Sequence, residues 1–121
     1  MGLLLFKKKF LEPIRRGQKR MTLRRWDRPR VTAGRRAFCP GLGYLQIQTI
    51  EPVDWADLNE ADALADGFAS LPAMRATLLS IYPTRDDGKR WWRIRFEWVR
   101  PDGWREESVL FDEDAVDNED Q

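Results

Sequence analysis

Two long stretches of the chain alternate between apolar and polar residues, which is the pattern of a half-buried β-strand. One covers residues 44–53, with a bend expected near Thr49, and the other covers residues 91–99. One face of the second stretch carries Trp92, Ile94, Phe96 and Trp98. A chain with two such strands has to build a sheet with a buried face, and shorter strands have to complete it.

Four shorter strand patterns are bounded by glycine and proline, and they lie over residues 2–6, 21–24, 35–39 and 105–111. The last of them follows a predicted hairpin turn at Pro101-Asp102-Gly103. Short helices are predicted from Phe10 to a stop at Gly17, from a cap at Asn59 to Gly67, and from a cap at Ser70 to Tyr82. The order of elements predicts an α+β fold, a small β-barrel with short helices packed around it. The 121 residues suit one domain over residues 1–111, followed by an acidic tail over residues 112–121.

The residue types that the chain lacks narrow its chemistry. Histidine is absent and Cys39 is the single cysteine, so an internal disulfide, a cysteine-cluster metal site and histidine acid-base catalysis are all excluded. We therefore expect no metal and no cofactor. We also expect a cytoplasmic protein with no membrane partner, because no stretch approaches the roughly 20 apolar residues of a membrane span. The run Leu3–Phe6 precedes its lysines, which is the reverse of a signal peptide.

Charge is divided unevenly along the chain. Residues 1–36 hold 13 Lys or Arg against two acids, a net of +11, whereas residues 37–121 hold 8 basic and 18 acidic residues, a net of −10. The total of +1 therefore hides a strongly basic segment. Such asymmetry is typical of a surface that faces a polyanion, and we expect RNA or a nucleoside as the partner.

The basic segment contains a recognisable spacing. Residues 17–24, Gly-Gln-Lys-Arg-Met-Thr-Leu-Arg, resemble the Gly-x-Lys-x-x-Thr-x-Arg signature of ASCH domains, which belong to the PUA-like superfamily of small RNA-associated β-barrels. Other resemblances follow in the family's order over residues 3–98: Thr32-Ala33-Gly34 at its Pro-Gly-Asp turn, Asp66-Gly67-Phe68 and Ser70 at its Glu-Gly-Phe-x-Ser, Tyr82-Pro83 at its Tyr-Pro, and Trp92–Phe96 at its closing strand.

The resemblance implies a choice of activities. Some ASCH domains are amidohydrolases that remove the acetyl group from N(4)-acetylcytidine, and others are RNA-binding modules or ribonucleases. In the amidohydrolase branch a Lys, a Thr and a Glu carry the chemistry. The first two correspond to Lys19 and Thr22, and Asp66 stands in the place of the Glu with a side chain one methylene shorter.

A threonine hydroxyl is a poor nucleophile that needs a neighbouring base, and a lysine amine can be that base when burial and nearby cations lower its pKa. Asp66 would orient the amine, and Arg24 would bind phosphate or stabilise an oxyanion. On one regular strand Lys19 and Thr22 would face opposite sides. They can meet only if the strand begins near Arg20 or Met21 and Lys19 lies in the preceding turn.

Candidate nucleic-acid contacts come from the basic segment and comprise Arg20, Arg24, Arg25, Trp26, Arg28 and Arg35. We predict a loop over residues 25–30, in which Trp26 would stack on a base between phosphate-binding arginines. The alternatives are a Trp26 folded onto the core, a solvated strand face at Arg35 and Arg36, a surface acid at Asp66, and a solvated Lys19 beside a strand Thr22.

The leading hypothesis is an RNA- or modified-nucleoside-binding domain whose basic face surrounds a pocket lined by Lys19, Thr22, Arg24 and Asp66. The alternative is a metal-independent amidohydrolase acting on N(4)-acetylcytidine-like substrates, with Lys19 as base, Thr22 as nucleophile and Asp66 as orienting carboxylate. A ribonuclease ranks lower because the chain has no histidine. A protein-interaction module is a further alternative.

Overall fold

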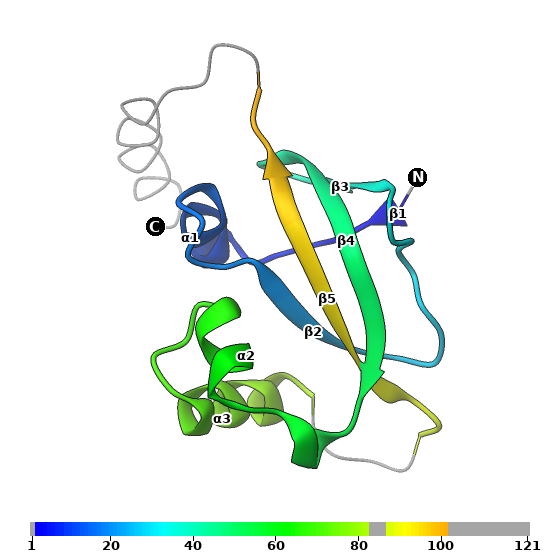
Figure 1. Cartoon of the computed structure of the whole chain (residues 1–121), viewed down its shortest axis with the longest axis vertical. Coiled ribbons are helices and arrows are strands. Elements are labelled where there is room, and N and C mark those ends of the chain that lie inside the picture. Colours follow the sequence, from blue (N-terminus) through cyan, green and yellow to red (C-terminus); the bar gives the residue numbers. More distant parts are fainter. Residues whose placement is uncertain (1, 83–86, 102–121) are drawn as a thin grey trace.

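The computed structural model describes residues 2–82 and 87–101, and these residues form one five-stranded mixed sheet with short helices around it (Figure 1). In the sheet the strands lie in the order β1-β3-β4-β5-β2. Their bounds are Gly2–Leu3 for β1, Met21–Trp26 for β2, Arg36–Cys39 for β3, Gly43–Val53 for β4 and Arg90–Val99 for β5. The described strands curl into a half-barrel, which confirms the predicted α+β class.

The two long alternating stretches form the centre of the sheet. β4 and β5 pair antiparallel from Tyr44 opposite Val99 to Val53 opposite Trp91, and the register shifts between Ile47 and Thr49. This irregularity confirms the bend expected near Thr49. β2 pairs antiparallel with the other side of β5, and β1 pairs parallel with β3 at the far edge.

The α-helices begin and end close to their predicted positions, at α1 (Leu11–Arg15), α2 (Glu60–Ala65) and α3 (Leu71–Ile81). Two 3₁₀ turns, η1 (Lys8–Phe10) and η2 (Trp55–Asp57), were not predicted. Asn59 caps α2 by accepting the Asp62 N–H at 2.9 Å, and Asp62 accepts the Asn59 N–H at 3.2 Å in return. Ser70 caps α3 by accepting the Ala73 N–H at 3.2 Å.

Two predicted elements differ from the observed ones. The prediction of a loop over residues 25–30 is wrong for Arg25 and Trp26, because both continue β2 and pair with Trp91 and Arg90. The first strand is shorter than predicted, since β1 ends at Leu3 and only the Leu4 N–H still bonds to β3, at the Phe38 carbonyl (2.9 Å). The predicted turn at residues 101–103, the strand over 105–111 and the tail over 112–121 extend into residues 102–121, outside the described part of the chain.

Both faces of the sheet are buried against helices. On one face α1 packs on β3, β4 and β5, with Leu11 and Ile14 in a cluster that contains Ile94 and Phe96. On the other face α2 and α3 pack on β2 and Trp91. β2 is therefore an edge strand at which helices from both faces approach.

No helix in residues 2–82 and 87–101 is long and apolar enough to cross a membrane.

Candidate functional site

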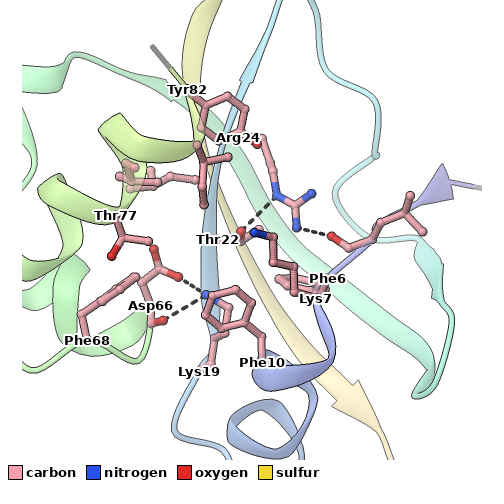
Figure 2. Close-up of a pocket in the computed structure, with 14 residues that line it drawn as sticks. Phe6, Lys7, Phe10, Lys19, Thr22, Arg24, Asp66, Phe68, Thr77 and Tyr82 are labelled. Carbon is pink, nitrogen blue, oxygen red and sulfur yellow. Dashed lines mark hydrogen bonds and ion pairs between the residues drawn. The ribbon is translucent and has the colours of Figure 1, made fainter. Parts of the chain in front are cut away.

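A cavity of about 170 Å³ lies at the edge strand β2, between the segment before α1 and the helices α2 and α3 (Figure 2). Its lining combines aromatic rings with a few polar side chains. The residues that line it are Leu5, Phe6, Lys7, Phe10, Lys19, Thr22, Leu23, Arg24, Asp66, Phe68, Thr77, Leu78, Ile81 and Tyr82.

Lys19 and Asp66 form a buried ion pair in the wall of this cavity. The Lys19 amine donates to the Asp66 carboxylate, and it also donates to the Asp66 backbone carbonyl at 3.0 Å. Only 5% of the Lys19 side chain and 3% of the Asp66 side chain are exposed. The pairing is tertiary, because Lys19 lies in the turn before β2 and Asp66 is the residue that ends α2.

Local geometry explains why the Lys19 side chain turns inward. Gly17 ends α1 with a φ of +76°, a conformation that glycine adopts without strain. The Lys19 N–H then bonds to the Pro13 carbonyl at 3.1 Å, and the Arg20 N–H bonds to the Ala65 carbonyl at 2.7 Å. The second bond ties the turn to α2, which brings the Lys19 side chain beside Asp66.

Three aromatic rings surround the amine. The Lys19 Nζ lies 4.9 Å from the ring centre of Phe10, 5.7 Å from that of Phe6 and 6.0 Å from that of Phe68. An ammonium within about 6 Å of a ring centre is attracted by the ring's electron density when it lies over the face. The rings therefore replace part of the hydration that the protonated amine loses on burial.

Burial also shifts the protonation equilibria of the pair. It lowers the pKa of the Lys19 amine, although Asp66 opposes the shift. It raises the pKa of the Asp66 carboxyl, although Lys19 opposes that shift. Both directions favour the uncharged forms, and an amine with a lowered pKa is what a lysine base requires.

On the opposite wall of the cavity, Arg24 contacts Thr22, Leu5 and Phe6. Its Nε donates to the Thr22 hydroxyl at 3.1 Å, and its terminal nitrogen donates to the Leu5 carbonyl at 2.7 Å. Its guanidinium carbon lies 4.7 Å from the ring centre of Phe6. Because the Thr22 oxygen accepts from Arg24, the hydroxyl proton remains available for a different partner.

Four of the residues predicted from the sequence, Lys19, Thr22, Arg24 and Asp66, line this one cavity. The geometric condition for Lys19 and Thr22 is met, because β2 begins at Met21 and Lys19 precedes it. Within the described residues, no hydrogen bond joins the Lys19 amine to the Thr22 hydroxyl. The amine instead bonds to Asp66.

The other predicted contacts are dispersed. Arg20 lines a separate cavity. Arg25 points to the face opposite Arg24, where it pairs with Asp87 at 3.0 Å and lies over the ring of Trp91. Arg28 and Arg35 are exposed on the connection between β2 and β3, which runs along the right-hand edge in Figure 1, whereas the helices lie on the left.

Trp26 is half-buried against the core cluster that contains Leu11 and Ile94, and its carbonyl accepts the Trp92 indole N–H at 3.0 Å. This placement matches the alternative in which Trp26 packs on the core. The basic segment over residues 15–36 therefore does not form a single face around the cavity.

Sequence reasoning missed the aromatic lining. Phe6 ends the predicted strand over residues 2–6 and Phe10 begins a predicted helix, and neither pattern shows that the two rings face one cavity. Phe68 follows the glycine after α2, and in the sequence only the resemblance to Glu-Gly-Phe-x-Ser marks it. The one usable signal was that all three phenylalanines lie within five residues of a predicted element end.

Within residues 2–82 and 87–101 no three His, Cys, Asp or Glu side chains gather to hold a metal ion.

No family model and no curated protein matches the chain. Solved structures of similar fold do match it. An ASCH domain from Lactobacillus crispatus JV V101 is similar at 15% identity with a TM-score of 0.60, over 71% of this chain and 67% of the other. A protein of the family DUF984 from Enterococcus faecalis V583 is similar at 16% identity with a TM-score of 0.61, over 82% of this chain and 81% of the other. The chain therefore has the fold of an ASCH domain.

Proposed function

We propose that this protein binds RNA by accepting one unpaired or modified base in the cavity at β2. The observation that carries the proposal is a concave site that combines three phenylalanine rings with the buried Lys19–Asp66 pair. Proteins read single-stranded RNA by splaying out a base, stacking it on aromatic side chains and pairing its polar edge. The cavity offers both a stacking surface and polar groups.

The size of the cavity limits what can enter. Its 170 Å³ is well below the roughly 300–1,000 Å³ of pockets that enclose drug-sized ligands. A single pyrimidine ring suits this volume, with the sugar and phosphates left at the mouth. Lys7 is exposed at that mouth and supplies positive charge there.

The polar groups match the edge of a pyrimidine base. The Asp66 carboxylate can accept an amino or amide N–H, and the Thr22 hydroxyl can donate to a ring nitrogen or a carbonyl. Arg24 lies over Phe6 and fixes Thr22, so these groups are held before the ligand arrives. Such preorganisation favours a selected base over general adhesion to polyanions.

Adjacent arginines on opposite faces of β2 provide a matched test. We expect Arg24→Gln to weaken binding of a single-stranded oligonucleotide on the order of tenfold, because it removes a charge-assisted hydrogen bond and disturbs Thr22. Arg25→Gln removes the same charge one residue away and should change the affinity less than twofold at moderate salt. Fluorescence anisotropy measures both, and thermal unfolding checks that each variant is folded.

Two outcomes would contradict the proposal. One is the absence of any RNA or nucleoside binding at low salt. The other is an equal loss in both arginine variants, which would show that binding depends on total charge rather than on the cavity.

A second candidate function is hydrolysis of an acylated cytidine, and the specific observation that favours it is the gathering of Lys19, Thr22 and Asp66 in one cavity. The neutral Lys19 amine would take the Thr22 hydroxyl proton as the oxygen attacks the acyl carbonyl. The carbon–nitrogen bond then breaks, Lys19 returns the proton to the departing nitrogen, and water hydrolyses the acyl-threonine ester. For this step the Lys19 amine must turn from Asp66 toward Thr22.

Incubation with N(4)-acetylcytidine tests this candidate. We expect release of cytidine by the wild type and none by Lys19→Ala or Thr22→Val. Chromatography follows the product. Turnover that survives Lys19→Ala would exclude the mechanism. Binding of N(4)-acetylcytidine without turnover would exclude hydrolysis and remain consistent with the proposed binding function.

A further inference from the structure

A second cavity adjoins the first across Lys19. It measures about 390 Å³ and lies between the turn that joins α1 to β2 and the C-terminal part of β5, from Arg95 onward. Lys19 lines both cavities, and Ala65 lines the second while Asp66 lines the first. The two sites therefore share one wall, built from the turn before β2 and the end of α2.

Arginine dominates the lining of this second cavity. Arg15, Arg20, Arg95 and Arg100 line it together with a single acid, Glu97. Arg20 and Arg95 lie close together, because the Arg20 carbonyl accepts the Phe96 N–H at 3.0 Å and Met21 is paired with Arg95. Cations from α1, from the turn before β2 and from β5 and the residue after it thus line one cavity.

Two of these guanidinium groups keep most of their donors available. In the described part of the chain Arg20 has one partner for its side chain, the Gly17 carbonyl at 3.3 Å. Arg95 has one ion-pair contact there, with Asp62 at 3.9 Å, and 45% of its side chain is exposed. A guanidinium carries five N–H donors in a planar fork that fits the oxygens of a phosphate.

We propose that the second cavity is a phosphate site, so that the ligand of this protein is an RNA strand rather than a free nucleoside. The inference rests on the proposed function, in which the first cavity receives the base. The base enters beside Phe10 and Asp66, and a neighbouring phosphodiester binds Arg20 and Arg95 on the other side of Lys19. Arg15 is half-buried, donates to the Gly41 carbonyl at 2.9 Å and pairs with Glu12 at 3.4 Å, so we assign it no direct contact with the phosphate.

Three probes separate the two cavities. Cytidine reports the base site alone, pyrophosphate reports the phosphate site alone, and hexacytidylate reports both. We expect the wild type to bind hexacytidylate at least tenfold more tightly than cytidine. The double variant Arg20→Gln/Arg95→Gln should lose on the order of tenfold for hexacytidylate and keep the wild-type affinity for cytidine. Pyrophosphate should compete with hexacytidylate and leave cytidine bound.

Arg28→Gln/Arg35→Gln is the matched control, because it removes two exposed arginines that line neither cavity. Its affinity for hexacytidylate should fall less than twofold at moderate salt. An equal fall in both double variants would overturn the phosphate site, since the loss would then reflect net charge. Calorimetry measures the affinities.

The outcomes also distinguish this inference from the proposed function. Binding of cytidine with no gain for hexacytidylate overturns the phosphate site and leaves the base site standing. Pyrophosphate binding that requires Arg20 and Arg95, without cytidine binding, supports the phosphate site and contradicts the base site. Failure of all three probes to bind overturns both.

Discussion

At the scale of single residues, the Lys19–Asp66 pair is the most consequential contact in the molecule. Both side chains have left water, and a buried ion pair often gains little over a well-packed apolar pair of the same volume. A pair of this kind is better explained by the need for polar groups at that position than by stability. The aromatic rings around the amine hold the charge in place.

Removal of one partner should show how much a buried charge without its counter-ion lowers the free energy of unfolding. Asp66→Asn leaves the Lys19 amine buried without its carboxylate, and we expect the free energy of unfolding to fall by about 3 kcal/mol. The double variant Lys19→Met/Asp66→Leu removes both charges and should be less destabilised than Asp66→Asn. Urea denaturation measures the difference. A double variant less stable than the single would show that the pair itself stabilises the fold.

Cys39 gives a prediction about pH. Burial raises the pKa of its thiol to about 11, against an ordinary value near 9. Between those values the folded chain keeps a proton that the unfolded chain has lost, so the associated stability is present below pH 9 and lost as the pH rises through 11. Urea midpoints from pH 8 to 11 should therefore fall more steeply for the wild type than for Cys39→Ala, and parallel pH profiles would refute the assignment.

At the scale of elements, β2 decides where the basic segment points. Alternation along the strand sends Thr22 and Arg24 to one face of the sheet and Leu23 and Arg25 to the other. Leu23 still lines the first cavity, which extends around the edge of β2, whereas Arg25 does not. Residues 22–25 thus supply Thr22 and Arg24 to the candidate site and Arg25 to the ion pair with Asp87. The charge count of residues 1–36 could not show this division, because it contains no information about strand direction.

The predicted elements succeeded where the signal was local. Asn59 and Ser70 cap their helices through their own side chains, and the bend near Thr49 follows from a break in alternation. The prediction of a loop over residues 25–30 failed because pairing with Trp91 and Arg90 of β5, far away in the sequence, extends β2 through two residues that resemble a basic turn. Phe6, Phe10 and Phe68 reach the cavity through tertiary packing, which no local pattern encodes.

The cap of α2 has an effect beyond the helix. Asn59→Ala removes the acceptor of the Asp62 N–H and should cost about 1 kcal/mol of unfolding free energy. Since α2 ends at Asp66, we also expect weaker ligand binding in the same variant. Asn59→Asp keeps an acceptor and serves as the control in denaturation and binding assays. Equal stability of the two variants would mean that the cap contributes nothing.

At the scale of the whole molecule, the charges of the two ends of the sequence oppose each other. Residues 1–36 carry a net of +11, and residues 112–121 carry six acids and no base. Long-range repulsion from the acidic residues lowers the local concentration of a polyanion, and salt screens that repulsion. If RNA is the ligand, as proposed, the balance of charge changes how readily it approaches the candidate site.

Deletion of residues 112–121 should therefore raise RNA affinity several-fold at about 50 mM salt, where the Debye length is long, and have little effect near 500 mM. Anisotropy titrations across that range measure the change. Replacement of the six acids by Asn and Gln should reproduce the deletion, because charge rather than chain length is the cause. An effect that persists at high salt would point to direct contact instead.

The place of β5 in the sheet has a consequence for how the protein is made. Of the described strands it is the last to leave the ribosome, yet it lies between β2 and β4 and pairs with both. Until residues 90–99 have emerged, β2 has no neighbour, and Thr22 and Arg24 have no fixed position. The candidate site, to which residues 5–24 contribute eight of the 14 lining residues, is therefore assembled only after β5 has been synthesised.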